Sequence, residues 1–247
     1  MCLNKNMIDV KNNLGYPNLI STSVSWLPMD SEELFDYNYK NNRKKIEKYN
    51  WTKNSITYKF NKFGFRSDEF GEGDSIVFLG CSFTIGIGVP DNVHFSNLVA
   101  TELNLNCYNL GIGGASNDCC FRLAYYWLAK LKPKICVYVE PEDTRFEIKC
   151  EIEEKYQFGN YNVQDIGSLQ SPLKEFYPYW LYNDANSFLK KQKNLLGIQK
   201  LCDNNSIKFI HTDNKFVEID YARDLVHPGI KSNANKAQKI LNKITVQ

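Results

Sequence analysis

Short apolar runs alternate with helical patterns along most of this chain, and this alternation limits its fold more than any other feature. Strands are expected at residues 75–80, 106–110, 135–139 and 207–211, and helices near 93–103, 117–131, 184–203 and 229–244. Near-continuous apolar strands that alternate with helices indicate a parallel sheet covered by helices on both faces. The expected fold class is therefore α/β, in a three-layer α/β/α arrangement. Ligands of such sheets bind outside the carboxyl ends of the strands.

The length of 247 residues suits one α/β domain with additions. Residues 55–247 are expected to form this domain. The apolar stripe of its last helix is expected to face the core and consists of Ile230, Ala234, Ala237, Leu241 and Ile244. Residues 1–54, rich in Asn, Lys and Tyr, are expected to form an N-terminal extension packed on the core. A helix is expected there from about Ser31 to Tyr49, with Ser31 as its N-cap.

An insertion is expected at about residues 141–182, because this segment is too long for an ordinary strand-to-helix connection. Its aromatic side chains could stack on sugar rings or shape an acyl pocket. They could equally form a small satellite core under the loop. These residues are Tyr156, Phe158, Tyr161, Phe176, Tyr177, Tyr179 and Trp180.

Charge and cysteine placement exclude several classes of protein. Thirty basic residues balance 28 acidic ones without a basic stripe, so no nucleic-acid partner is expected. No apolar run approaches the length of a membrane span, and the N-terminus lacks the apolar region of a signal peptide. Cytoplasmic synthesis is therefore expected, and the composition is compatible with a virion-associated phage protein. The eight cysteines show no zinc-type pairs and are expected to be reduced, buried thiols.

Two segments together contain a nucleophile, a base and an orienting acid. The first apolar run stops at Gly80 and delivers Ser82 into a turn. Near the other end of the chain, Asp224 stands three residues before His227, which Pro228 follows. A serine hydroxyl needs a base within hydrogen-bond reach, and that base must be held in the right tautomer. In a loop, Asp224 can fold back to Nδ1 of His227 and leave Nε2 for Ser82.

The other two histidines fit this role less well. His94 is expected to begin a helix, and His211 ends a strand, where a structural role or a place at a pocket rim is expected. Cys81 is an alternative nucleophile. However, it lies on the opposite side of an extended chain from Ser82 and is expected to pack under the turn.

These motifs resemble those of the SGNH hydrolases, the GDSL-type esterase and lipase superfamily. The first block of that family is matched by Gly80–Phe83, its Asn-x-x-x-x-Gly turn by Asn109–Gly114, and its Asp-x-x-His-Pro block by Asp224–Pro228. The segment Ile56–Arg66 resembles the lead-in found ahead of the nucleophile in many members. The resemblance covers roughly residues 55–245. It implies a flavodoxin-like parallel sheet, with Ser82, His227 and Asp224 as the catalytic triad.

The oxyanion hole is where the chain departs from this family. The third block supplies an Asn side chain to the hole, but the corresponding segment Glu140–Arg145 contains no Asn. The backbone amides of Ser82 and Gly114 are the expected donors. Asn117, Arg145 or a backbone amide near Glu142 could replace the third. Cys81 also stands where the family name has Asp, a residue outside the triad.

Glycines after the second strand suggest a competing interpretation, a loop that cradles a phosphate. Gly111, Gly113 and Gly114 follow a strand and precede a helix, but their spacing fails the dinucleotide fingerprint. A nucleotide-binding flavodoxin-like module is therefore the third and weakest hypothesis.

The leading hypothesis is a serine acyl-ester hydrolase, a carbohydrate O-deacetylase or small-chain esterase. Its substrate would be a small acyl ester or an acetylated glycan, and no metal or organic cofactor is needed. Weak activity is expected, because only part of the oxyanion hole can be assigned. The alternative is a catalytically weak or inactive SGNH-like binding or structural protein, for example a phage particle component. The oligomeric state stays open.

Overall fold

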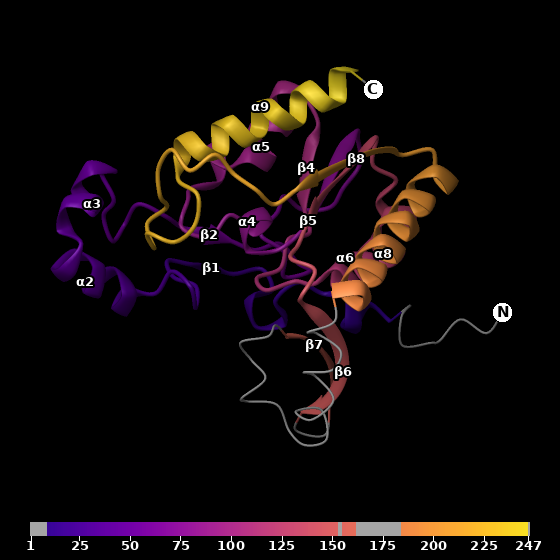
Figure 1. Cartoon of the computed structure of the whole chain (residues 1–247), viewed down its shortest axis with the longest axis horizontal. Helices are drawn as coiled ribbons and strands as arrows, with labels where there is room; N and C mark the ends of the chain where they lie inside the picture. The colour runs from indigo at the N-terminus through magenta and orange to yellow at the C-terminus, as the bar shows by residue number, and fades with distance from the viewer. Residues whose placement is uncertain (1–8, 153–154, 162–183, 247) are drawn as a thin grey trace.

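A four-stranded parallel sheet forms the centre of the computed structural model, which describes residues 9–152, 155–161 and 184–246 (Figure 1). The strands lie in the order β4-β3-β5-β8 and span Ser75–Leu79 (β3), Asn106–Asn109 (β4), Ile135–Glu140 (β5) and Lys208–Asp213 (β8). Counted along the chain this order is 2-1-3-4, the start of the flavodoxin-like doubly wound order. Its switch point lies between β3 and β5. The expected α/β fold class is confirmed.

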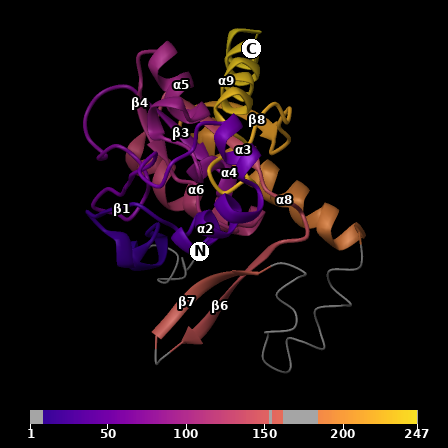
Figure 2. The same cartoon turned by 90° about the vertical axis from the view of Figure 1, so that its left-hand side faces the viewer.

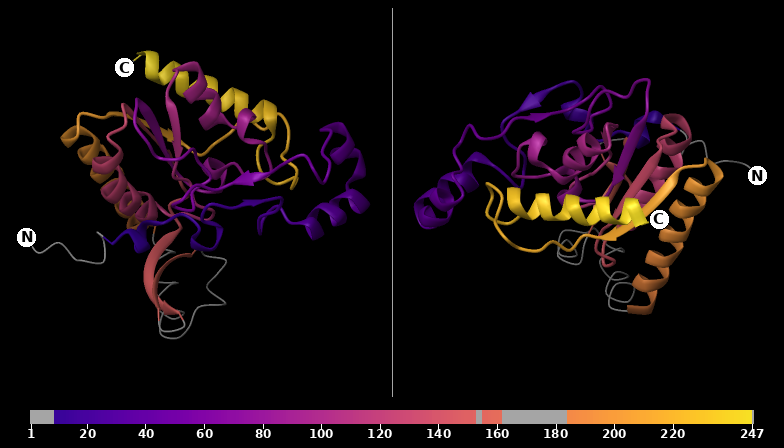
Figure 3. Two further views of the ribbon diagram at one scale, coloured as in Figure 1. Left: turned by 180° about the vertical axis from the view of Figure 1, so that it is seen from behind. Right: turned by 90° about the horizontal axis from the view of Figure 1, so that it is seen from above.

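Helices cover both faces of this sheet, as Figures 1 and 3 show. Helices α5 (Phe95–Glu102) and α9 (Ile230–Val246) lie on one face, and α6 (Asn117–Leu131) and α8 (Asp184–Asn204) lie on the other. Alternate residues of each strand point to opposite faces. Ile76 and Phe78 of β3 therefore join the α5/α9 core, while Val77 and Leu79 join the α6/α8 core. Burial on both faces explains why the strand is a continuous apolar run.

The N-terminal segment forms a third apolar cluster against the sheet's carboxyl edge. It contains α2 (Glu32–Asn41) and α3 (Arg43–Lys48), the 3-10 turns Val10–Asn13 and Pro17–Leu19, and a small ribbon of β1 (Ser23–Val24) with β2 (Tyr58–Lys59). The expected single helix is interrupted at Asn42, where φ is −128°. Ser31 caps α2 by accepting a hydrogen bond from the Leu34 amide at 3.2 Å. The cluster combines residues from distant segments: Phe35, Ile46, Trp51, Tyr58, Ile85, Val89 and Ala222.

An antiparallel hairpin occupies the first part of the expected insertion. Strands β6 (Phe146–Ile152) and β7 (Lys155–Tyr161) pair along their whole length and project from the body of the protein (Figure 2). Three of the expected insertion aromatics, Tyr156, Phe158 and Tyr161, belong to β7. The other four lie outside the described residues.

The buried stripe expected for α9 is partly wrong. Ile230 is 37% exposed and Ala234 is also exposed, whereas Ser232, Asn233 and Lys236 are buried. Polar anchoring sets the rotation of the helix: the Asp220 carboxylate accepts hydrogen bonds from the amides of Lys231 and Ser232, each at 2.9 Å. Ala237 and Ile244 are buried as expected.

Six cysteines are free and buried, in agreement with the expected reduced thiols: Cys81, Cys107, Cys119, Cys120, Cys136 and Cys202. Within the described ranges, no helix is both long and apolar enough to cross a membrane.

Candidate active site

Ser82 stands at the carboxyl end of β3. It is the first residue of a one-turn helix, α4 (Ser82–Ile85), where the sequence analysis expected a turn. The carbonyl of Cys81 accepts hydrogen bonds from the amides of Thr84 and Ile85, at 2.9 and 3.0 Å. Cys81 is buried beneath the turn and Ser82 is half-buried. Of these two neighbours, Ser82 is therefore the one that a substrate can reach.

His94 is buried and contacts the backbone of α4. Its Nε2 lies 2.9 Å from the carbonyl oxygen of Phe83, and its Nδ1 lies 2.7 Å from the Ser96 hydroxyl. Complete burial lowers the pKa of His94 to about 3, so the ring is neutral at physiological pH. A neutral ring that donates from Nε2 to a carbonyl cannot also serve as the general base. His94 caps α5, as expected for a residue that begins a helix.

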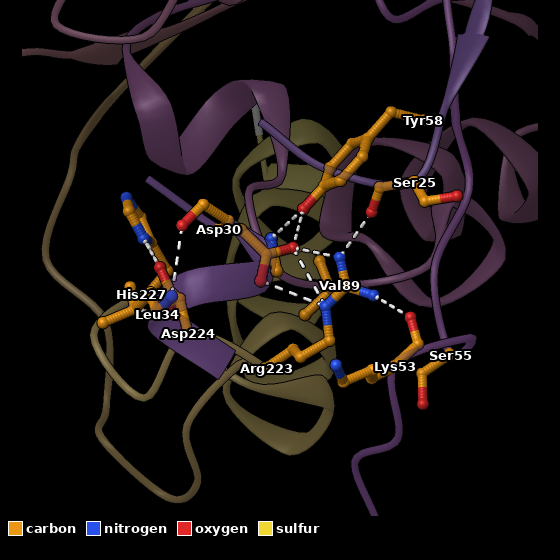
Figure 4. Close-up of polar contacts among 12 residues, drawn as sticks. Ser25, Asp30, Leu34, Lys53, Ser55, Tyr58, Val89, Arg223, Asp224 and His227 are labelled. Atoms are coloured by element: carbon orange, nitrogen blue, oxygen red, sulfur yellow. Dashed lines mark hydrogen bonds and ion pairs between the residues drawn. The ribbon is translucent and has the colours of Figure 1, made fainter. Parts of the chain in front are cut away.

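Asp224 and His227 form a buried contact in the loop before α9 (Figure 4). The Asp224 Oδ2 atom is hydrogen-bonded to Nδ1 of His227. Oδ1 accepts hydrogen bonds from the amides of Val226 and His227, each at 3.0 Å. The turn between them places Leu225 at a φ of 59°, a conformation uncommon for leucine. This arrangement orients the imidazole so that Nε2 is the nitrogen left for a proton transfer.

Two contacts connect the His227 loop to the chain around Ser82. The ring of Phe83 packs edge-to-face on the His227 ring, with centroids 5.4 Å apart. The amide of Arg223 donates to the carbonyl of Gly88 at 2.9 Å. The expected hydrogen bond from Ser82 Oγ to His227 Nε2 is not formed within the described part of the chain. Catalytic hydrogen bonds are often long without substrate and tighten only in the complex.

The Gly114 turn lies beside the end of β3 because the Ile112 amide donates to the Gly80 carbonyl at 3.1 Å. The Gly113 amide donates to the hydroxyl of Tyr16 at 2.7 Å, and burial raises the pKa of Tyr16 to about 12. Gly114 has a φ of +72° and is exposed, and a Cβ there would meet nothing within 4 Å. Neither the Ser82 nor the Gly114 amide donates a hydrogen bond to another described residue. Both expected oxyanion donors are thus free to bind a ligand.

The two candidate side chains for the third donor are both deeply placed. Asn117 is wholly buried; its Oδ1 accepts from the Tyr138 hydroxyl, and its Nδ2 has no hydrogen-bond partner among the described residues. Arg145 pairs with Glu142 at 3.3 Å, while its buried Nε and Nη1 atoms have no hydrogen-bond partner in the same part of the chain. Each residue keeps an unused donor at the carboxyl edge of the sheet. In both, the unused atoms are shielded from solvent.

His211 is committed to a separate ionic cluster. Its Nε2 lies 2.6 Å from the carboxylate of Glu140, whose other oxygen lies 2.8 Å from Nζ of Lys191. Burial would raise the pKa of Glu140, but the hydrogen bonds from His211 and Lys191 outweigh burial and leave this pKa lowered. Glu140 is therefore ionised and paired with these two neighbours. His211 is occupied by this contact and is not available as a base for Ser82.

Two cavities of about 310 and 700 Å³ lie elsewhere on the protein. The smaller is lined by residues such as Arg66, Asp68 and Asn97, and the larger lies along α8 and β8. Neither is lined by Ser82, Asp224 or His227. The described residues include no cluster of three or more side chains suited to a metal ion.

Several residues around the Asp224–His227 contact were missed by the sequence analysis. Asn38 of α2 donates to the Asp224 carbonyl at 3.2 Å, and Arg223 forms a buried ion pair with Asp30 at 2.7 Å. The partners stand more than 180 residues apart, so no local pattern predicts them. An arginine directly before the proposed acid was the one available signal.

Comparison with solved structures finds partial matches to two esterases and a lipolytic protein. One is the psychrotrophic esterase EstA from Pseudoalteromonas sp., with 9% identity, a TM-score of 0.36 and coverage of 70% of this chain and 98% of that one. A G-D-S-L family protein from Desulfitobacterium hafniense DCB-2, described as lipolytic, has 11% identity, a TM-score of 0.35 and coverage of 67% and 97%. The acetyl xylan esterase AlAXEase has 16% identity, a TM-score of 0.31 and coverage of 68% and 98%.

These neighbours are lipolytic proteins and esterases. One of them is described as a G-D-S-L family protein, and the motifs of this chain resemble the same family. No protein-family model matches the chain, and no curated protein matches it either. At this level of similarity, the function has to be inferred from the residues of the chain itself.

Proposed function

We propose that the chain is a GDSL-type serine ester hydrolase with Ser82 as nucleophile, His227 as general base and Asp224 as the orienting acid. The observation that supports this proposal is the buried Asp224–His227 contact, which occupies Nδ1 of an imidazole whose ring packs on Phe83, the residue after Ser82. Its other two histidines are committed elsewhere, to the Phe83 carbonyl and to Glu140.

The proposed reaction has two halves. Ser82 Oγ attacks the ester carbonyl while its proton passes to His227 Nε2, and Asp224 stabilises the imidazolium. The amides of Ser82 and Gly114 donate to the oxyanion. His227 then gives the proton to the leaving alcohol, and the acyl group stays on Ser82. A water molecule attacks this acyl-enzyme, its proton passes to His227 and then to Ser82, and the carboxylic acid leaves.

A short acyl group is the proposed substrate feature, as in a carbohydrate O-acetyl ester. Phe83 contacts both Phe216 and His227 with centroid distances of 5.4 Å, and both phenylalanine rings are partly buried. These rings place an apolar surface beside the proposed base. Such a surface suits a small acyl chain better than a charged group.

A second candidate function is a non-catalytic binding or structural role in an assembly such as a phage particle. The observations that favour it are the missing third-block Asn and the shielding of the unused donors of Asn117 and Arg145. Without a third donor, an acyl-transfer site loses about 10²–10³-fold in rate, which slows catalysis without abolishing it.

A fluorophosphonate probe separates the two functions without knowledge of the substrate. We expect the wild-type protein to form a covalent adduct on Ser82 and the Ser82→Ala variant to form none. The same pair is then compared on an activated acetate ester and on an O-acetylated oligosaccharide. If the wild-type protein neither reacts with the probe nor hydrolyses either ester, the proposal of an ester hydrolase is contradicted and the structural role is favoured.

A further inference from the structure

The N-terminal segment forms hydrogen bonds with the loop that carries Asp224 and His227 at three points. Nε1 of Trp51 donates to the Tyr221 carbonyl at 2.9 Å, and Asn38 donates to the Asp224 carbonyl at 3.2 Å. The third point is Arg223, which immediately precedes the proposed acid. Thus the loop is held by a part of the chain that lies almost entirely outside the family resemblance.

Arg223 is completely buried, and every described partner of its guanidinium comes from the N-terminal segment. Asp30 receives hydrogen bonds from Nε at 3.0 Å and from Nη2 at 2.7 Å (Figure 4). Carbonyl oxygens of Lys53 and Ser25 accept the remaining hydrogen bonds, at 2.7 and 2.6 Å. The centroid of the Trp26 ring lies 3.8 Å from the guanidinium carbon. A planar donor with this many partners has one permitted position.

The same network reaches the chain that follows Ser82. Asp30 also accepts a hydrogen bond from the hydroxyl of Tyr58, and that hydroxyl accepts one from the Gly88 amide at 2.8 Å. The carbonyl of Gly88 in turn accepts from the Arg223 amide at 2.9 Å. A Cβ at Gly88 would stand 2.7 Å from Cβ of Ala222, and φ there is +75°, so the two loops touch where only glycine fits.

We propose that Asp30, Tyr58 and Arg223 are positioning residues that set the distance between Ser82 and His227. The proposal rests on the proposed function for the roles of Ser82 and His227. Asp30 is the shared acceptor: through Arg223 it fixes the loop that ends at His227, and through Tyr58 it fixes Gly88, six residues after Ser82. Buried ion pairs contribute little net stability, whereas a fixed geometry is a use for which they are retained in some proteins.

The test compares Asp30→Asn and Tyr58→Phe with a matched control, Glu147→Gln. The control breaks another buried ion pair, Arg122–Glu147, which is 2.6 Å long and touches neither loop. The first measurement is the rate of fluorophosphonate labelling of Ser82. The second is the far-downfield proton NMR resonance of the hydrogen bond between Asp224 and His227 Nδ1, which needs no activity. Unfolding midpoints of all variants show how far a loss of stability alone could explain a change.

We expect both variants to label about 10- to 10²-fold more slowly than wild type, because a displacement of about 1 Å in a reacting group has this scale of effect. The downfield resonance should shift or broaden in both, and the control should keep both properties. Wild-type labelling and an unchanged resonance in both variants would overturn the proposal, as would an equal loss in the control. If Asp30→Asn does not fold, Tyr58→Phe decides alone, since its ring still fills the site.

Failure of the proposed function gives a different pattern. Wild type would then not label, yet the resonance would still respond to Tyr58→Phe and not to Glu147→Gln, and the positioning of His227 would stand. Absence of the resonance in wild type would show that the histidine is not held, and would overturn the positioning proposal itself.

Discussion

The ring of Phe83 stands at 81° to the imidazole of His227, with the ring centroids 5.4 Å apart. Because Phe83 directly follows Ser82, the residue beside the proposed nucleophile also restricts rotation of the proposed base. Edge-to-face ring pairs contribute about 0.5–1.5 kcal/mol beyond their buried area. His227 is thus held by Asp224 at one nitrogen and by Phe83 at its ring.

Phe83→Ala should therefore slow the fluorophosphonate labelling of Ser82 by more than its loss of folding stability can explain. The ring that limits the rotation of His227 is removed, while the backbone contacts of α4 remain. Phe70→Ala is a suitable control, because Phe70 packs on Phe63 and Trp127 and has no ring contact with His227. If both variants label at the wild-type rate, Phe83 does not restrict the base.

Asp224→Asn should lower kcat by roughly 10²–10⁴-fold, by analogy with other triads. An amide can still accept hydrogen bonds from Val226 and His227 at Oδ1, which preserves the turn. Its NH₂ group, however, would face Nδ1 and favour the wrong tautomer of the ring. Ester hydrolysis and urea unfolding, measured on the same preparation, separate the two effects. An unchanged rate would mean that another group orients His227.

Much of the fold could be predicted, because the apolar runs in the sequence mark where the strands and helices of the core lie. The two inner strands, β3 and β5, are buried along their whole length, so each appears in the sequence as a short, mainly apolar run. The helix α9 shows the limit of this argument: a stripe counted from apolar residues misses Lys236, whose buried Nζ lies 3.2 Å from the Thr212 hydroxyl. The β6 segment does alternate apolar with charged residues, a strand pattern that the sequence analysis assigned to an insertion.

The candidate site divides in the same way. The Asp224–His227 contact spans three residues, so a local pattern is enough to suggest it. Asp30 and Arg223 stand 193 residues apart, and nothing in their local sequence indicates that they meet. Contacts of this kind depend on how the chain folds back on itself, which periodicity does not encode.

Arg145→Ala and Asn117→Ala should each leave weak hydrolysis of an activated acetate ester largely unchanged. The unused Nε and Nη1 atoms of Arg145 and the Nδ2 atom of Asn117 are shielded from solvent, where a substrate oxygen would have to enter. The amides of Ser82 and Gly114 should therefore carry the oxyanion alone. Steady-state kinetics beside Ser82→Ala, which should abolish activity, provide the scale. A fall of about 10²–10³-fold in one variant would identify that side chain as the third donor.

Acid should destabilise the protein through His94. Its pKa is about 3 in the folded chain and 6.5 ordinarily, so between these values the unfolded chain binds one more proton at this residue. Stability must then fall as pH falls through this window, by about 1.4 kcal/mol per pH unit. Urea unfolding at pH 7 and pH 5 should show wild type losing about 2 kcal/mol more than His94→Gln does. Because carboxylates titrate in both proteins, only the difference in slope reports on His94. Equal slopes would show that the ring is charged, or reached by solvent, in the folded protein.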